Sequence, residues 1–372
     1  MAVPETILQF GAGRFLRGFV DRFVQQATDG GQAVGQAVVV QSTPGQRAEL
    51  LNGQPQGYHV LVRGYQEGQL VERLEQVRTI SRALTAEADW SEVLQVAVSP
   101  ELKWIVTNAT ESGYVLRPED GRDDAPPKTL PAKLTQLLWA RYQQKGSPLT
   151  LLPCELIEGN AHKLRDLVLS QARTWGLDAP FADWVRQDCL WLNNLVDCIV
   201  TRAPTDHPLA ATDPLMISAE PFALWAIERP QGRDVPLFSN PAIQLVDDLK
   251  PFYLRKVRIL NGLHTAMAAR YEPRGFQTVQ EVLENRDACR WLRGLLFEEI
   301  VPTIAYKVED VAEFADTTFD RLRNPYLHHR LSDILMNHAD KVRVRLEPTR
   351  EKYEQLFGRP PRRLSELLSK KS

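Results

Sequence analysis

The feature that most constrains the fold is a glycine turn close to the N-terminus. An apolar run at residues 6–10 leads into Gly11 and Gly13, and apolar residues at helical spacing follow over residues 14–27. A strand, a glycine turn and a helix in this order are typical of the first unit of a dinucleotide-binding sheet, where glycines let a pyrophosphate approach the backbone next to a helix N-terminus. Leu16 replaces the third glycine of the usual G-x-G-x-x-G pattern, so a purely structural turn stays open here.

Short apolar runs alternate with amphipathic stretches over the first 175 residues. Besides the first strand and helix, the pattern predicts strands at 37–41, 103–108 and 149–154, and helices at 89–98, 130–144 and 161–175. Residues 58–63 and 70–77 are typical of a hairpin inserted after the second strand. The fold class is therefore α/β: a Rossmann-type, doubly wound, mostly parallel sheet followed by a mainly α-helical domain.

In the second half of the chain, recurring prolines interrupt the alternation of strands and helices. Prolines recur between residues 204 and 241, leaving room only for short helices such as 220–227; a last strand is expected at 243–249, and helical patterns dominate beyond Pro251. We expect two domains: a dinucleotide-binding Rossmann-like domain at 1–245 and a shortened helical domain with substrate and catalytic residues at 246–372.

Charge and composition argue against several function classes. Lys and Arg number 45 against 47 Asp and Glu, so no basic excess points to nucleic acid. No long apolar run predicts a membrane span. The four cysteines are far apart, as expected in the reducing cytoplasm. His207, His328 and His329 lack metal-ligand spacing and are interpreted as surface histidines, so no metal site is expected.

The densest cluster of polar side chains opens the helical region, at Lys256, Asn261 and His264. On an α-helix, Asn261 falls about 140° and His264 about 80° around the axis from Lys256, which places all three toward one side of a cleft. A lysine can exchange a proton with an alcohol when its pKa is lowered, and an amide and an imidazole can hold the substrate oxygen. The alternative is a solvated lysine, a capping asparagine and a hydrogen-bonded structural histidine.

The chain resembles the polyol-specific long-chain dehydrogenases, the mannitol dehydrogenase family, and within it the tagaturonate reductase (altronate oxidoreductase) branch. The matching segments keep one order along nearly the whole chain: 8–21, 107–113, 130–135, 153–157 with Asn160, 193–197, 247–252, 256–265 and 321–325. The resemblance implies reversible hydride transfer, without a metal, between a nicotinamide cofactor and a sugar acid or polyol.

The same resemblance assigns roles to individual residues. Lys256 becomes the general acid and base, Asn193 and Asn261 the oxyanion site, and His264 a substrate ligand. Arg321 and Asn324 become substrate ligands, because an arginine can hold a carboxylate through two parallel hydrogen bonds. A structural role for Arg321 between two helices is the alternative.

Cofactor residues are predicted at the carboxyl ends of the strands. They are Gly11, Gly13, Arg14, Phe15, Gln41 and Asn108, and the family resemblance implies that Asn108 lies beside the nicotinamide. The second strand ends in Gln41 without a carboxylate, which leaves NAD and NADP open. Arg47 could meet a 2′-phosphate, or it is a solvated loop residue.

Two departures from the family pattern leave alternatives open. Cys198 stands where the family has an arginine, and the family's helical domain continues past the position of Ser372. A shortened domain could alter the substrate or leave an apolar face for a second subunit, so a monomer or homodimer is expected. The alternatives to a sugar-acid reductase are a mannitol/fructose-type polyol or sugar-phosphate dehydrogenase and a non-catalytic nucleotide-binding sensor or scaffold.

Overall fold

The chain divides into two compact units in the computed structural model, which describes residues 3–109, 113–326 and 329–369. The first unit comprises Met1–Val62, Arg73–Ala219 and Ala223–Leu249, and the second comprises Arg63–Glu72, Glu220–Phe222 and Lys250–Ser372. The predicted division at 245/246 differs from this one mainly in two short segments, 63–72 and 220–222, which precede residue 245 but belong to the second unit.

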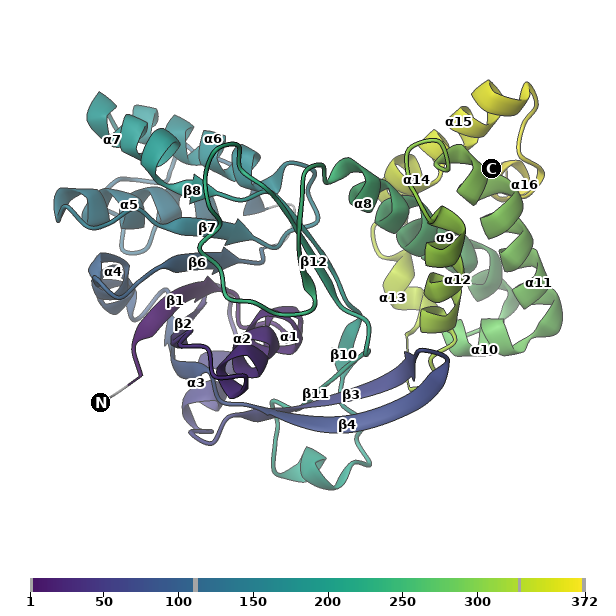
Figure 1. Cartoon of the computed structure of the whole chain (residues 1–372), viewed down its shortest axis with the longest axis horizontal. Helices are drawn as coiled ribbons and strands as arrows, with labels where there is room; N and C mark the ends of the chain where they lie inside the picture. The colour runs from purple at the N-terminus through teal and green to yellow at the C-terminus, as the bar shows by residue number, and fades with distance from the viewer. Residues whose placement is uncertain (1–2, 110–112, 327–328, 370–372) are drawn as a thin grey trace. The chain divides into compact units, whose positions relative to one another are not determined.

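A six-stranded parallel sheet forms the centre of the first unit (Figure 1). Its order is β5-β2-β1-β6-β7-β8, so the chain builds outward from β1 in one direction and then returns to continue on the other side of β1. This is the doubly wound Rossmann arrangement, and it confirms the predicted fold class. The strands are β1 (Glu5–Phe10), β2 (Gln36–Gln41), β5 (Ile80–Thr85), β6 (Trp104–Thr107), β7 (Thr150–Pro153) and β8 (Leu190–Trp191).

Alternate residues of the strands feed two cores on opposite faces of this sheet. Leu8 of β1 packs with α4, α5 and α6, whereas Ile7 packs with α1 and α2. Because both faces are covered, the strands are continuously apolar, which is why the sequence pattern predicted four of them correctly. The helices are α1 (Arg14–Gly18), α2 (Val20–Asp29), α4 (Trp90–Val98), α5 (Leu130–Gln143) and α6 (Asn160–Thr174).

The predicted helix at 14–27 is in fact two helices that meet at Phe19, whose φ is −125° and ψ −84°. Gly18 ends α1 where the helix passes against another sheet: a Cβ on Gly18 would lie 2.8 Å from a methyl group of Val200 and 3.2 Å from Ile217. The helix therefore breaks where Gly18 packs against the neighbouring strands, and the spacing of apolar residues did not predict this break.

Two smaller sheets lie mainly in the first unit, apart from residues 63–72 at the tip of the hairpin, which belong to the second. The predicted hairpin, β3 (Tyr58–Gln66) and β4 (Gln69–Val77), joins β10 (Val200–Arg202) and β11 (Ile217–Ala219) in the order β10-β11-β3-β4. The second sheet has the order β13-β12-β9 and contains β9 (Asn194–Asp197), β12 (Leu224–Glu228) and β13 (Ile243–Val246). The short connecting helices are α3 (Arg47–Asn52), α7 (Ala179–Asp183), η2 (Trp184–Asp188) and η3 (Pro208–Ala211).

The prediction of a short helix at 220–227 was wrong. Leu224–Glu228 is strand β12, which pairs antiparallel with β9 and parallel with β13. Trp225, Ala226 and Ile227 are completely buried, so pairing on both edges and burial on both faces override the local pattern. The predicted last strand is β13, and it belongs to this sheet rather than to the parallel one.

The second unit is built mainly of helices around one hydrophobic core. Its central helix, α9 (Gly262–Tyr271), is buried along Gly262–Ala268 and packs within that core. The other helices are α8 (Lys250–Arg255), η4 (Lys256–Asn261), η5 (Glu272–Arg274), α10 (Val279–Glu284), α11 (Arg286–Gly294), η6 (Leu295–Ile300), η7 (Val301–Thr303), α12 (Val311–Leu322), α13 (Leu331–Leu335), α14 (His338–Arg345), α15 (Glu347–Phe357) and α16 (Arg362–Leu368). Of the helices described, none combines the length and apolarity needed to cross a membrane.

Candidate functional site

A cavity of about 380 Å³ lies at the carboxyl ends of β1, β2 and β6 in the first unit. Gly11 follows β1, Gln41 ends β2, and Asn108 follows β6. The chain reverses its building direction between β1 and β6, and ligands of open α/β sheets bind at such a switch point. Four of the six predicted cofactor residues line this cavity: Gly11, Gly13, Gln41 and Asn108.

Gly11 is required by the geometry of the turn. Its φ is +134°, a conformation that L-residues rarely adopt, and its N–H donates to the carbonyl of Val40 at 3.1 Å. A Cβ on Gly11 would also lie 3.1 Å from Leu16 Cδ1, so the leucine that replaces the third glycine packs directly over the turn. Gly13 has open space where a side chain would be, which leaves its backbone approachable from the cavity.

The other predicted cofactor residues behave differently. The Gln41 amide holds the loop after β2: its nitrogen donates to the carbonyls of Thr43 and Gly45 at 2.9 and 2.7 Å, and its oxygen accepts from the Ala48 N–H at 2.8 Å. The side chain thus shapes the cavity edge. Arg14 is exposed, and Phe15 stacks on Phe19 with ring centroids 5.0 Å apart; neither is among the residues that line the cavity.

Basic side chains also line the cavity, and two of them, Arg117 and Lys128, were not predicted from the sequence. Arg117 and Lys128 join Arg47 and Lys133, and Lys133 matches a family position for which both a site role and a structural role were open. Burial lowers the pKa of the Lys133 amine, against an opposing effect of Asp120, and its Nζ donates to the Lys128 carbonyl at 2.6 Å. Four basic residues around one cavity favour an anionic ligand. The matching segment at 130–135 was the available signal for Lys133.

A buried carboxyl group ties the ends of β6 and β7 together. Glu155 accepts hydrogen bonds from the Thr107 hydroxyl at 2.8 Å, the Ala109 N–H at 2.7 Å and the Tyr114 hydroxyl at 2.9 Å, and burial raises its pKa. The Asn108 amide donates to the Cys154 carbonyl at 2.8 Å. These bonds fix the strand ends beside the cavity. Residues 110–112 of the matching segment 107–113 lie outside the described residues.

Asn193 belongs to the first unit, and its amide is hydrogen-bonded at both ends. The oxygen accepts from the backbone N–H groups of Ala161 and His162, both at 3.1 Å. The nitrogen lies 2.8 Å from Glu228 Oε2 and 3.0 Å from His162 Nδ1. An oxyanion role for Asn193 therefore requires one N–H to leave Glu228 or His162. Neither of these partners was among the predicted site residues.

Lys256, Asn261 and His264 lie together in the second unit, but not on the regular α-helix that the prediction assumed. Lys256–Asn261 forms a π-helix, and α9 continues from Gly262. Hydrogen bonds from residue i to i+5 take more residues per turn, so Asn261 lies closer to directly above Lys256 than the α-helical angle of about 140° predicted. Short π-helical segments of this kind are frequent at functional sites.

Two polar atoms that follow Lys256 in the sequence are buried without a hydrogen-bond partner among the described residues: Asn261 Nδ2 and His264 Nε2. Burial lowers the pKa of His264 well below its usual value, and the charges of His329, Arg321, Arg345 and Lys341 lower it further. The imidazole is therefore neutral at neutral pH. Buried polar atoms are normally paired, so two unpaired ones on successive turns are suited to a polar ligand.

His329, interpreted from the sequence as a surface histidine, is half-buried in the structure. Its ring lies edge-on against His264 with ring centroids 4.8 Å apart, and burial lowers its pKa. Its backbone carbonyl accepts from the Val279 N–H at 3.0 Å, which brings the start of α10 next to the segment that carries His329. His328 lies outside the described residues.

Arg321 is held by a carboxylate of the protein itself. Its Nε and Nη2 lie 2.9 and 2.7 Å from the two Glu220 oxygens, both side chains are buried, and the guanidinium lies 3.9 Å from the ring centre of Phe222. Glu220 thus has the two-pronged geometry that the prediction gave to a substrate carboxylate, which favours the structural alternative. Asn324 donates to the Arg63 carbonyl at 2.9 Å and accepts from the Tyr326 N–H at 3.1 Å.

The basic residues Lys341 and Arg345 of α14 were not predicted as site residues. Lys341 Nζ donates to the Ile334 carbonyl at 2.7 Å, and its pKa is lowered by burial and by the charge of Arg345. Arg345 donates to the hydroxyl of Thr265, the residue after His264, at 3.2 Å. Their charges act on His264, so an anion is favoured in this region. Across the described parts of the chain, His, Cys, Asp and Glu side chains form no group of three or more that could hold a metal ion.

Both units match known protein domains. The sequence model for the mannitol dehydrogenase Rossmann domain matches residues 5–237, and the one for the mannitol dehydrogenase C-terminal domain matches residues 248–362. The altronate oxidoreductase of Bacillus subtilis (strain 168) is 37% identical over 375 residues, covering 97% of this chain and 78% of the relative. The altronate oxidoreductase of Halalkalibacterium halodurans is 36% identical, covering 96% of this chain and 73% of the relative.

Solved structures show the same fold. The mannitol 2-dehydrogenase of Pseudomonas fluorescens, solved as a ternary complex with NAD and D-mannitol, superposes with a TM-score of 0.84 at 21% identity, covering 99% of this chain and 78% of that one. A D-sorbitol dehydrogenase in substrate-free form superposes with a TM-score of 0.82 at 22% identity, covering 99% and 80%.

Proposed function

Because this chain belongs to the mannitol dehydrogenase family, we propose that it is an NAD-dependent oxidoreductase that interconverts a sugar-acid ketone and its alcohol, of the tagaturonate/altronate type. Relatives that are more than a third identical over nearly the whole chain are altronate oxidoreductases, which supports the sugar acid.

The cavity at the strand ends fits a nicotinamide dinucleotide. Gly11 and Gly13 offer backbone to the pyrophosphate, the basic side chains around the cavity offset its charge, and Asn108 lies at the end of β6 for the nicotinamide. When bound, the cofactor donates or accepts the hydride. NADPH is the alternative to NADH, because β2 ends without a carboxylate and Arg47 lines the cavity.

Lys256 provides the proton. In the reductive direction it donates a proton to the new alkoxide, and in the oxidative direction it accepts the hydroxyl proton. We assign Asn261 Nδ2 and the neutral His264 to hydrogen bonds with the same oxygen, because both have a buried nitrogen without another partner among the described residues. This chemistry uses no metal ion, so we expect turnover to survive dialysis against EDTA.

The positive charge around His264 is the observation that carries the choice of a sugar acid over a neutral polyol. The charges of Arg321, Arg345 and Lys341 all act on His264, and Arg321 is paired with Glu220. Lys341 retains two N–H donors beyond its bond to Ile334. We assign the substrate carboxylate to Lys341 rather than to Arg321.

An absorbance assay of nicotinamide oxidation tests the proposal. Purified protein is given NADH or NADPH with tagaturonate, fructuronate, fructose or fructose 6-phosphate. We expect oxidation of NADH with a keto-acid and little with fructose. Turnover confined to fructose or its phosphate would replace the sugar acid by a polyol or sugar phosphate. Cofactor binding without turnover on the whole panel would favour the non-catalytic sensor.

A further inference from the structure

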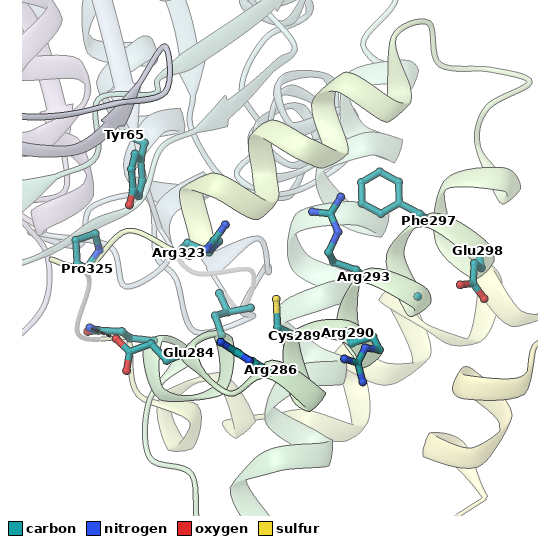
Figure 2. A pocket seen from close by; sticks show the side chains of 13 residues that line it. Tyr65, Glu284, Arg286, Cys289, Arg290, Arg293, Phe297, Glu298, Arg323 and Pro325 are labelled. Atoms are coloured by element: carbon teal, nitrogen blue, oxygen red, sulfur yellow. Dashed lines mark hydrogen bonds between the residues drawn. The ribbon is translucent and has the colours of Figure 1, made fainter.

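The helical unit contains a second cavity that the proposed reaction does not use. It has a volume of about 940 Å³ and lies along α11, with contributions from α10, the residues after α12 and the end of β3 (Figure 2). Lys256, Asn261 and His264 are not among its lining residues. Its volume is within the range typical of small-molecule sites.

Arginines dominate the lining of this cavity. Arg286, Arg290 and Arg293 recur at intervals of four and three residues along α11, so all three lie on one face of that helix. Arg323 adds a fourth guanidinium from the residue that ends α12. Figure 2 shows the four side chains arranged around the cavity, with the Tyr65 ring at its edge.

Two of the four arginines have acidic partners. Arg290 lies 3.1 Å from Asp287, and Arg293 lies 3.2 Å from Asp316. Arg293 is also positioned by two aromatic rings, since its guanidinium carbon lies 4.9 Å from the ring centre of Phe297 and 5.2 Å from that of Phe319. These contacts hold the guanidinium of Arg293 beside two rings, although the side chain is 49% exposed.

The other two, Arg286 and Arg323, form no ion pair with a carboxylate in the part of the chain that the structure describes. Two glutamates also line the cavity, and one of them pairs with an arginine outside the lining. Glu298 lies 2.7 Å from Arg363, and Glu284 accepts from Gln280 at 2.8 Å. Arg286 and Arg323 thus bring two guanidinium groups to the cavity that no carboxylate of the described residues pairs with.

We propose that this cavity binds a small phosphorylated metabolite and serves as a site separate from the dehydrogenase chemistry. A guanidinium donates two parallel hydrogen bonds to phosphate oxygens, and a phosphate monoester carries nearly two negative charges at neutral pH, so one group can satisfy two arginines. A carboxylate carries only one charge. Tyr65 places a phenol at the edge of the same cavity.

Calorimetric titration with inorganic pyrophosphate tests this site. The full chain is titrated with saturating NADH present, so that the dinucleotide cavity is filled, and at constant ionic strength. We expect saturable binding that the double variant Arg286→Gln/Arg323→Gln weakens at least about tenfold, because two charge-assisted contacts are lost. Arg343→Gln, an exposed arginine of α14 that pairs with Asp340, is the control and should leave the affinity unchanged.

Labelling of Cys289 provides a second measurement, since its thiol lines the cavity and is partly exposed. In a Cys198→Ser background, pyrophosphate should slow the reaction of Cys289 with a thiol reagent, and the double variant should remove this protection. The proposal is overturned by absence of saturable binding, by equal affinity of the double variant, or by citrate binding as tightly as pyrophosphate. None of these measurements depends on turnover, so failure of the proposed function would be seen separately.

Discussion

Lys256 is the residue on which the proposed proton transfer depends. Replacing it by alanine removes the acid and base but leaves the dinucleotide cavity of the first unit intact. We therefore expect Lys256→Ala to lower kcat by about 10²- to 10⁴-fold, as is usual when general acid–base catalysis is lost. NADH affinity, followed by fluorescence, should stay unchanged.

The matched control is Lys250→Ala, which removes an exposed lysine of the preceding helix. Its kcat should equal that of the unmodified chain. Near-normal turnover of Lys256→Ala would contradict the assigned role.

Either Lys341 or Arg321 could bind the substrate carboxylate, and variants at Lys341 distinguish the two. Lys341 has donors to spare near His264, whereas Arg321 is paired with Glu220. We expect Lys341→Gln to raise KM for a keto-acid substrate by about tenfold, the loss of one charge-assisted hydrogen bond, with a much smaller effect on kcat.

The control for this prediction is Arg343→Gln on the same helix, which should leave KM as it is. An unchanged KM in Lys341→Gln would mean that Lys341 does not bind the substrate carboxylate. Either Arg321 would then bind it, or the substrate would not be a sugar acid.

Helix α2 carries a buried carboxyl group that links the stability of the first unit to pH. Asp21 is held by Gln9 of β1 and by Tyr58 of β3, at 3.2 and 3.3 Å, and burial raises its pKa to about 7. The ordinary pKa of an aspartate in an unfolded chain is about 3.9. Between about pH 4 and 7 the folded protein holds a proton that the unfolded chain has released. The free energy of unfolding therefore falls as pH rises through this window and is level above it.

We expect Asp21→Asn to remove this dependence. At pH 8 the variant should be more stable than the unmodified chain, by roughly 4 kcal/mol at most at 1.36 kcal/mol per pKa unit, whereas near pH 4 the two should be alike. Urea unfolding at a series of pH values measures the difference. A parallel pH dependence in both proteins would show that Asp21 ionises normally.

At the scale of the whole molecule, stability depends on contacts between residues that are distant in the sequence. Glu220 lies before the predicted domain boundary but pairs with Arg321 inside the second unit, where both side chains are at most 3% exposed. Breaking a buried ion pair leaves an uncompensated charge, so Glu220→Gln should lower the free energy of unfolding by about 3–5 kcal/mol. Replacing both partners together, as Glu220→Leu/Arg321→Met, should recover much of that loss.

An exposed ion pair of the same unit gives the comparison. Asp340→Asn breaks the pair with Arg343, in which both side chains are more than two-thirds exposed, and should cost no more than about 1 kcal/mol. Chemical unfolding of the full chain measures all three variants. A cost of Glu220→Gln as small as that of Asp340→Asn would mean that Arg321 finds another partner.

The sequence by itself determined the parts that depend on local pattern. Continuous apolar runs predicted β1, β2, β6 and β7, because strands covered on both faces carry no polar alternation to mislead the reading. Gly11 marked the turn at the switch point, since only glycine adopts its backbone conformation easily. The spacing of Lys256, Asn261 and His264 also marked one cluster, which the structure places on successive turns.

Tertiary structure decided what no local pattern contains. Strand β12 forms because β9 and β13 pair with both its edges, and η4 is a π-helix although its residues fit α-helical spacing. Burial against His264 turned His329 from an expected surface residue into a neighbour of the site. Glu220 became the partner of Arg321 across 101 residues of sequence. Each outcome depends on which distant groups share a desolvated space, and that is fixed only when the chain is packed.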